Sequence, residues 1–440
     1  MVRTSNLPTR PISTGSQEPS HLRVDANLLI PGRGEPIHNA SIISSTGKID
    51  YVGPSNALPL DYGNLKPEAI IPVLMPGMWD CHLHFFGSDK YRVDTQAATN
   101  PTLAGARSAR DLAATLNAGV TSVREMAGYG SELAQAVGEG WLPGPNIYSA
   151  VSMLSQTAGH GDARSMDLSV LCDKISHGLP FYICDGIDEC RKAVRVQIRR
   201  GAKVIKIAAS GGVASLHDDI SLQQFSEEEM DVMVKEAQRA KLIVGAHCHS
   251  KDGIMAALRA GCKTIEHGTY LDEECVSLML QRNAILVATR STLEFALTHP
   301  EAWTEEMYKQ MLLIGEQHLS AYRMAVKAGV RIALGTDLGV SSKETPWNHG
   351  MNGIEFKYAV KAGLSPLEAI GAGTANAPLT LGPQGPRSGL LAEGYDADFI
   401  GLKENPLENI SILAVPEKIL YVWKAGILYK APGMPVGLLP

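Results

Sequence analysis

The two ends of the chain share one pattern of apolar and polar positions. Residues 22–75 consist of short apolar runs separated by turn formers such as Pro31-Gly32-Arg33-Gly34. This punctuation is typical of short antiparallel strands, and it returns beyond residue 395. We therefore expect a small β-sandwich domain built from both termini, with residues 21–75 as its first part and residues 385–440 as its second.

The middle of the chain, residues 76–384, alternates helix-like runs with short strands rich in β-branched residues. Four helical runs end at a glycine that a strand follows directly, and glycine terminates a helix easily in a left-handed conformation. One amphipathic run starts at Ser226 with Glu229 three residues later, which is a capping-box pattern. The four glycines are Gly119, Gly201, Gly261 and Gly329, and the eight predicted strands are 71–79, 120–125, 146–150, 202–208, 242–248, 263–267, 284–288 and 330–336. Eight strand–helix units predict an α/β fold with a (β/α)8 TIM barrel rather than an open doubly wound sheet.

Residues able to bind metal follow several of these strands. In a (β/α)8 barrel, side chains beyond the C-terminal ends of the strands share one rim. His82 and His84 are one residue apart, so an extended backbone points both to the same side. The other members are Lys206, His247, His267 and Asp337. Each alone has an ordinary interpretation as a surface histidine, a helix cap or an outward lysine, but their convergence predicts a metal site.

Lys206 needs a separate explanation because an ammonium group has no lone pair for a cation. Desolvation lowers the pKa of a buried lysine, and the free amine can then combine with carbon dioxide. The resulting carbamate would carry a negative charge and two oxygen atoms. It could bridge two metal ions about 3.5–4 Å apart.

Composition and charge narrow the functional classes. The chain has 440 residues, 45% of them hydrophobic, and a net charge of -6. A pI near 6.1 gives no electrostatic reason to expect nucleic acid or an anionic membrane as partner. No apolar stretch is long enough to span a bilayer.

The terminal tail and the cysteines leave the compartment open. Residues 1–20 are polar and predict a flexible tail without the apolar core of a signal peptide. The chain is therefore expected to be cytoplasmic or a secreted mature form. Seven cysteines at irregular spacings do not predict a disulfide framework, although a bridge among Cys172, Cys184 and Cys190 stays open.

Taken together, these motifs resemble the metal-dependent amidohydrolase superfamily, in the branch with a carboxylated lysine and a binuclear centre. The motifs are Pro76-Gly77-Met78-Trp79-Asp80-Cys81-His82-Leu83-His84, Lys206, the later strand-end histidines and Gly335-Thr336-Asp337. Gly159-His160-Gly161 and Ile265-Glu266-His267-Gly268-Thr269-Tyr270 are similar to motifs of the Xaa-Pro dipeptidase and carboxypeptidase-like subgroup. Glu125 departs from this pattern, since relatives often have Asp there, and so does the run Val287-Ala288-Thr289-Arg290.

The resemblance implies two divalent metal ions, usually Zn²⁺. His82, His84 and Asp337 would hold one ion, His247 and His267 the other, and carboxylated Lys206 would bridge them. Asp337 would also shuttle a proton, and His160 would contact the substrate carbonyl. His249 and Tyr270 are expected to bind the substrate carboxylate, with Arg290 as a weaker candidate. His349 and Trp347 have ambiguous roles, and we expect surface positions for His21, His38, His177, His217, His299 and His318.

The implied activity is hydrolysis of the amide bond of N-acyl amino acids or dipeptides, in the manner of a carboxypeptidase. An amide joining phenylalanine to an isocoumarin acid is among the expected substrates. A lactonase or an imidazolonepropionase-like cyclic amidase on the same metals is the alternative. A metal-free assembly protein is the alternative from another class, and the complete ligand set disfavours it. Relatives are commonly homo-oligomers, and specificity is expected to lie in loops 151–187 and 338–349.

Overall fold

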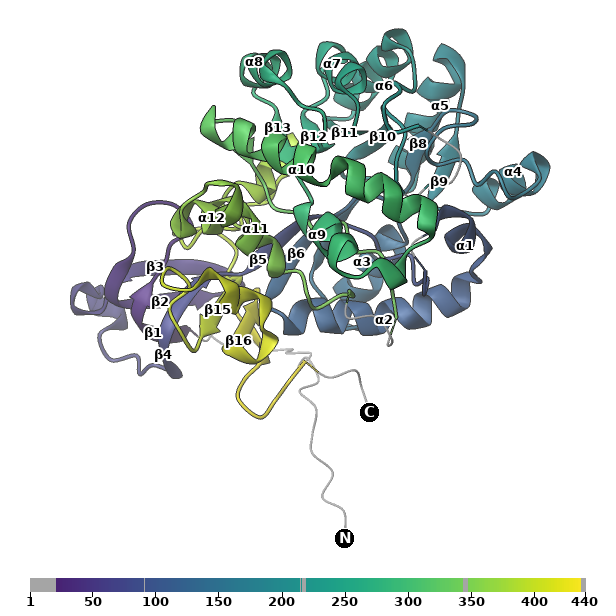
Figure 1. Cartoon of the computed structure of the whole chain (residues 1–440). Helices are drawn as coiled ribbons and strands as arrows, with labels where there is room; N and C mark the ends of the chain where they lie inside the picture. The colour runs from purple at the N-terminus through teal and green to yellow at the C-terminus, as the bar shows by residue number, and fades with distance from the viewer. Residues whose placement is uncertain (1–20, 91, 214, 216–218, 343–346, 437–440) are drawn as a thin grey trace.

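The computed structural model describes residues 21–90, 92–213, 215, 219–342 and 347–436. A barrel of parallel strands wrapped by helices stands beside a smaller sheet at one end of the molecule (Figure 1). The tail predicted over residues 1–20 and the predicted surface residue His217 lie outside the described residues.

The smaller domain is one seven-stranded sheet that contains strands from both ends of the chain. The strand order is β17-β16-β15-β4-β1-β2-β3. The bounds are β1 (Leu22–Leu29), β2 (Ile37–Ser45), β3 (Lys48–Pro54), β4 (Ala69–Pro76), β15 (Phe399–Leu402), β16 (Ile419–Lys424) and β17 (Ile427–Lys430). Ile42 and Trp423, from distant strands, share one buried cluster, and the Ile49 N–H donates to the Tyr395 carbonyl. The sheet therefore folds over a core of its own, which confirms the predicted small β domain.

Eight strand positions form the barrel, and the third is interrupted. The strands are β5 (Met78–Leu83), β6 (Val120–Glu125), β7 (Asn146–Ser149) with β8 (Met153–Ser155), β10 (Ile205–Ala208), β11 (Val244–Cys248), β12 (Thr264–His267), β13 (Ile285–Val287) and β14 (Arg331–Ile332). Val151, at a φ of 70°, separates β7, which pairs with β6, from β8, which pairs with β10. The barrel closes where the Cys81 N–H donates to the Leu334 carbonyl at 2.8 Å.

Helices connect the strands and cover the barrel. They are α1 (Val93–Ala98), α2 (Pro101–Asn117), α3 (Gly130–Gly138), α4 (Leu168–Ser176), α5 (Gly186–Arg199), α6 (Glu227–Arg239), α7 (Lys251–Ala260), α8 (Glu273–Arg282), α9 (Arg290–Thr298), α10 (Glu305–Lys327), α11 (Ile354–Ala362) and α12 (Pro366–Ala372). Helices α5 to α8 follow one another along the outside of the strands (Figure 1). The predicted capping box at Ser226 is present, and all four predicted joint glycines have positive φ. Among the described helices, none is both long and apolar enough to cross a membrane.

The structure corrects several predicted elements. Residues 71–79 are not one barrel strand, because β4 pairs with β15 in the small sheet and β5 pairs with β6 in the barrel. The chain passes between the two sheets at Gly77, whose N–H donates to the Asp398 carbonyl. The last predicted strand, 330–336, is reduced to the two residues of β14. The residues that follow make isolated backbone hydrogen bonds to β5 and do not form a continuous strand ladder with it. An unpredicted strand, β9 (Phe181–Ile183), pairs with β8.

All seven cysteines are free thiols. The Sγ atoms of Cys184 and Cys190 lie 3.8 Å apart, which is longer than a disulfide bond of about 2.05 Å. The bridge that the sequence left open among Cys172, Cys184 and Cys190 is therefore not formed in this structure.

Gly77→Ala is expected to lower the free energy of unfolding by about 1–3 kcal/mol. An added Cβ would overlap the buried side chain of Thr121 on the adjoining strand. Thermal denaturation measures the effect. Gly105→Ala is the control, because its Cβ would meet no heavy atom within 4 Å and alanine favours the helix interior. Equal melting temperatures for the two variants would contradict the expected overlap.

Candidate metal centre

The first cluster of ligand atoms joins the end of β5 to the segment after β14. His84 Nε2 lies 3.1 Å from Asp337 Oδ1, and His82 Nε2 lies 3.5 Å from the same oxygen. The Asp337 N–H donates to the His82 carbonyl at 2.6 Å, and Asp337 has a φ of 62°. This turn of the backbone brings the carboxylate of Asp337 to the two imidazoles. One ligand atom from each of the three residues lies within 4.8 Å of the others.

A buried ionic network orients His82. Its Nδ1 lies 2.8 Å from Glu266 Oε2, while Arg124 Nη2 donates to both oxygens of the same carboxylate, at 2.8 and 2.7 Å. Burial acts to raise the pKa of Glu266, but Arg124 and the hydrogen bond from His82 hold that pKa well below its ordinary value. An ionised Glu266 accepts the Nδ1 proton of His82 and leaves the Nε2 lone pair facing Asp337.

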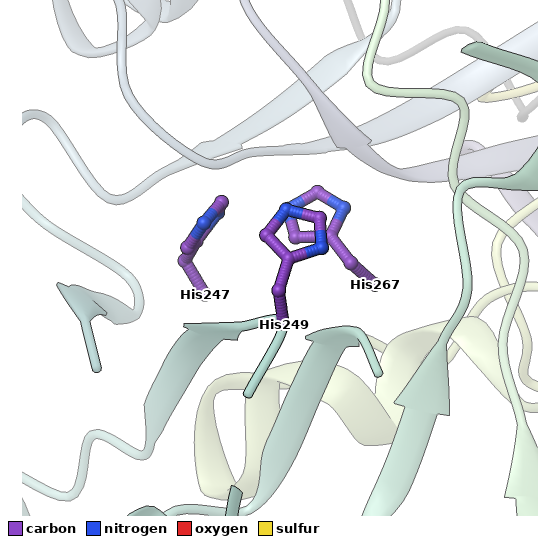
Figure 2. Close-up of side chains that lie close together, drawn as sticks. All are labelled: His247, His249 and His267. Atoms are coloured by element: carbon purple, nitrogen blue, oxygen red, sulfur yellow. The ribbon is translucent and has the colours of Figure 1, made fainter. Parts of the chain in front are cut away.

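The second cluster consists of three buried histidines, His247 and His249 from the end of β11 and His267 from the end of β12 (Figure 2). One ring nitrogen from each lies within 4.8 Å of the others. Burial lowers the pKa of His249 to about 3 and the pKa values of the other two well below the ordinary value. Three neutral imidazoles are good ligands for a divalent ion.

The orientation of these rings is set by two hydroxyl groups. His249 Nδ1 lies 2.7 Å from Thr269 Oγ1, and His267 Nδ1 lies 2.7 Å from Thr289 Oγ1. The sequence placed His249 only among the substrate contacts, whereas the structure groups it with the predicted ligands His247 and His267. Its position two residues beyond His247 was the available signal, because alternate residues of a strand share one face.

Lys206, on β10, lines the same cavity as both clusters. Its side chain is buried, and its Nζ has no hydrogen-bond partner among the described residues. Burial lowers the pKa of Lys206 to about 8. An unpartnered buried amine is costly, so this position fits the expected carboxylated ligand better than a structural lysine.

The other predicted contacts divide into two groups. His160 lines the cavity, and its ring stacks on His247 with 4.3 Å between centroids. Tyr270 is not among the lining residues and packs instead beside an apolar cluster. The prediction that Arg290 binds the substrate carboxylate is wrong. Its buried guanidinium already donates hydrogen bonds to the Glu294 carboxylate and to the Gly315 carbonyl.

Some histidines assigned to the surface are buried. His318 lines the cavity, and its Nε2 lies 2.8 Å from the Ala288 carbonyl. Met311, Ile314 and His318 recur on α10 at spacings of three and four residues, a periodicity that could have identified this inward face. His299, also assigned to the surface, is half-buried. His349, whose role was ambiguous, is buried with its ring stacked on Phe85. The surface predictions for His21, His38 and His177 are confirmed.

The remaining ambiguous residues are structural. Trp347 stacks on Phe295, with 5.2 Å between ring centroids. Glu125 accepts hydrogen bonds from the Phe85 and Gly130 N–H groups and from Ser149. Burial raises the pKa of Glu125 to about 8. This departure from the family pattern thus lies behind the site and does not line the cavity.

The comparisons identify the family that this site belongs to. Residues 73–428, more than half of the chain, match the amidohydrolase family model. The chain belongs to the amidohydrolase family. Ochratoxinase from Aspergillus niger is 46% identical over 446 aligned residues, which cover 98% of this amidohydrolase and 91% of the relative.

Solved structures agree with the sequence comparison. The crystal structure of A. niger ochratoxinase has a TM-score of 0.87 at 45% identity and covers 95% of this chain and 97% of its own. A prolidase complexed with N-methylphosphonate-L-proline has a TM-score of 0.84 at 32% identity, covering 94% and 100%. A Xaa-Pro dipeptidase with bound methionine has a TM-score of 0.81 at 29% identity, with the same coverage. The predicted resemblance to the amidohydrolases and to their Xaa-Pro dipeptidase-like subgroup is confirmed.

Glu266→Gln is expected to weaken metal binding by this amidohydrolase about 10- to 100-fold. The neutral amide removes the negative charge that pairs with Arg124. Its NH2 group donates and does not accept, so the side chain can no longer accept hydrogen bonds from Arg124 and His82 with both of its ends. Metal retention against a graded chelator measures the affinity, and thermal denaturation reports the lost ion pair. The exposed Glu35→Gln is the control. Wild-type metal retention in Glu266→Gln would show that the network does not support His82.

Proposed function

We propose that this amidohydrolase is a binuclear metal enzyme with zinc as the expected metal. His82, His84 and Asp337 would hold one ion. His247 and His267 would hold the other, with His249 beside them. The observation that carries the proposal is the pair of three-residue ligand clusters in one cavity, together with the buried and unpartnered amine of Lys206.

Carboxylation would convert Lys206 into a metal ligand. A pKa of about 8 leaves a fraction of the amine uncharged at neutral pH. The nitrogen lone pair would attack the carbon of carbon dioxide, and the loss of one proton from nitrogen would give the carbamate. The negative charge would then be compensated by the cations instead of being buried alone.

The proposed reaction is hydrolysis of an amide bond. Bound metal ions would lower the pKa of a water molecule and polarise the substrate carbonyl. Asp337 would accept the proton of the attacking water and deliver it to the leaving amine. The His160 ring, beside His247, would donate a hydrogen bond to the carbonyl oxygen.

N-acyl amino acids and dipeptides are the proposed substrates, cleaved in the manner of a carboxypeptidase. The similarity to an ochratoxinase, a prolidase and a Xaa-Pro dipeptidase supports this class. The conversion of ochratoxin A to ochratoxin alpha and phenylalanine is a specific candidate. His249 remains the proposed contact for the substrate carboxylate because its ring lines the cavity, whereas Tyr270 does not. Homo-oligomer formation also remains a proposal.

Asp337→Asn is expected to reduce kcat by about 10²- to 10⁴-fold, the usual contribution of a positioned acid–base group. The amide oxygen can still reach the His82 and His84 cluster, but it cannot carry the proton. Steady-state kinetics with metal analysis of the same sample measures both effects. Near-wild-type kcat with both metals retained would refute the proton-transfer role.

Removal of metal is expected to abolish hydrolysis, and added Zn²⁺ is expected to restore it. The protein should be dialysed against a chelator and assayed on N-acyl amino acids, dipeptides, ochratoxin A and a lactone series. Amide cleavage that depends on added metal supports the proposal. Cleavage confined to lactones would replace the substrate class, and full activity of the metal-free protein would exclude the binuclear mechanism.

A further inference from the structure

The cavity has two unlike apolar sides. One side, which we name the aromatic wall, consists of Phe86, Val93, Met153 and Phe181. The opposite side carries the aliphatic residues Leu293, Met311 and Ile314. Apart from the histidines, only Lys206 and Asp337 among the described lining residues have an ionisable side chain, and both belong to the proposed metal centre. The aromatic wall therefore suits an uncharged part of the substrate.

The rings of the aromatic wall form a stack that starts at the metal centre. The centroids of His84 and Phe86 are 4.7 Å apart with an angle of 7° between planes. Phe86 and Phe181 follow at 5.5 Å and 26°. The stack therefore extends from the ligand His84 to Phe181, and aromatic groups bind such surfaces by offset or edge-to-face contact.

Gln96 interrupts this apolar surface. It lies on α1, is only 6% exposed and lines the cavity next to the aromatic wall. Within the described parts of the chain, its side-chain amide makes no hydrogen bond. Neither amide atom is among the fully buried polar atoms that lack a partner, so the amide is open to the cavity. A ligand that supplies a donor or acceptor there would gain a hydrogen bond worth about 0.5–1.5 kcal/mol.

We propose that the aromatic wall and Gln96 together select substrates with a flat aryl group that carries a hydrogen-bonding substituent, such as a ring hydroxyl. The stack accounts for the ring, and the Gln96 amide accounts for the substituent. This inference rests on the proposed amide hydrolysis. It assigns specificity to Gln96 and Phe181, neither of which belongs to the ligand clusters.

The aryl group can belong to either half of the substrate, and two substrate pairs distinguish these cases. N-(hydroxybenzoyl)-alanine isomers against N-benzoyl-alanine test a ring on the acyl side. N-acetyl-tyrosine against N-acetyl-phenylalanine test a ring on the amine side. The metal-loaded wild-type enzyme is expected to prefer the hydroxyl-bearing member of one pair by about five- to tenfold in kcat/KM, the value of one hydrogen bond.

Gln96→Met is expected to abolish that preference while it changes kcat/KM for the unsubstituted member less than about twofold, because methionine keeps the side-chain length without the amide. Phe181→Leu is expected to lower kcat/KM for both members of the same pair by about fivefold, the value of an aromatic contact. Met311→Leu, on the opposite side, is the matched control and should keep the hydroxyl preference.

Three outcomes would overturn the inference: no hydroxyl preference in either pair, a preference that survives in Gln96→Met, or an equal loss on all four substrates in that variant. Melting temperatures identify a variant that fails to fold, and Gln96→Asn then replaces it. If the wild type hydrolyses none of the substrates, the proposed function fails separately. Calorimetry then tests the aromatic wall without hydrolysis. The wild type should bind 4-hydroxybenzoate more tightly than benzoate, and Gln96→Met should bind the two equally.

Discussion

The structure depends on one buried carboxylate that three barrel strands share. Glu266 on β12 accepts from Arg124 on β6 and from His82 on β5, and all three side chains are excluded from solvent. Arg124 also donates to the Cys81 carbonyl at 2.6 Å and to Thr264 at 2.9 Å. Breaking a buried ion pair by removing one partner costs about 3–5 kcal/mol. The same contacts that fix the strands therefore also fix the first ligand of the proposed metal centre.

A second buried carboxylate closes the barrel next to that ligand. Asp80 accepts hydrogen bonds from the Thr336 hydroxyl at 2.6 Å and from Asn352 at 2.8 Å. Burial raises the pKa of Asp80 to about 6, against the opposing effect of these hydrogen bonds. Because Thr336 precedes Asp337, the position of the proposed proton carrier is tied to β5 through Asp80. The hydrogen bonds of Asp80 thus hold His82, at the first barrel strand, and Asp337, after the last one, at fixed positions relative to each other.

Strand periodicity and glycine joints allowed the barrel, the small β domain and a group of strand-end residues on one rim to be predicted from sequence. The division of those residues between two metal ions came from the family resemblance. The change of sheet at Gly77 was missed because buried residues continue on both sides of Pro76-Gly77, and it is the tertiary pairing of β4 and β5 that separates the two strands. The strand β9 was missed because three residues carry no measurable period. Arg290 was misassigned because charge alone does not show that Glu294 and a carbonyl already occupy a guanidinium. His318 was misassigned although Met311 and Ile314 share its face of α10, because such spacing identifies a buried face but not the cavity that this face lines.

The break at Val151 in the third barrel strand has a consequence for how such enzymes diversify. After β8, the chain leaves the cylinder for an excursion that includes α4, β9 and α5, and it returns to the barrel at β10. Phe181 and the proposed carbonyl contact His160 reach the cavity from this detour, whereas the two ligand clusters come from the strands or from residues shortly after them. Mutations, insertions or grafts around β9 can therefore reshape what the enzyme accepts while the ligand clusters keep their places. Catalysis and selectivity can evolve at different speeds in one polypeptide.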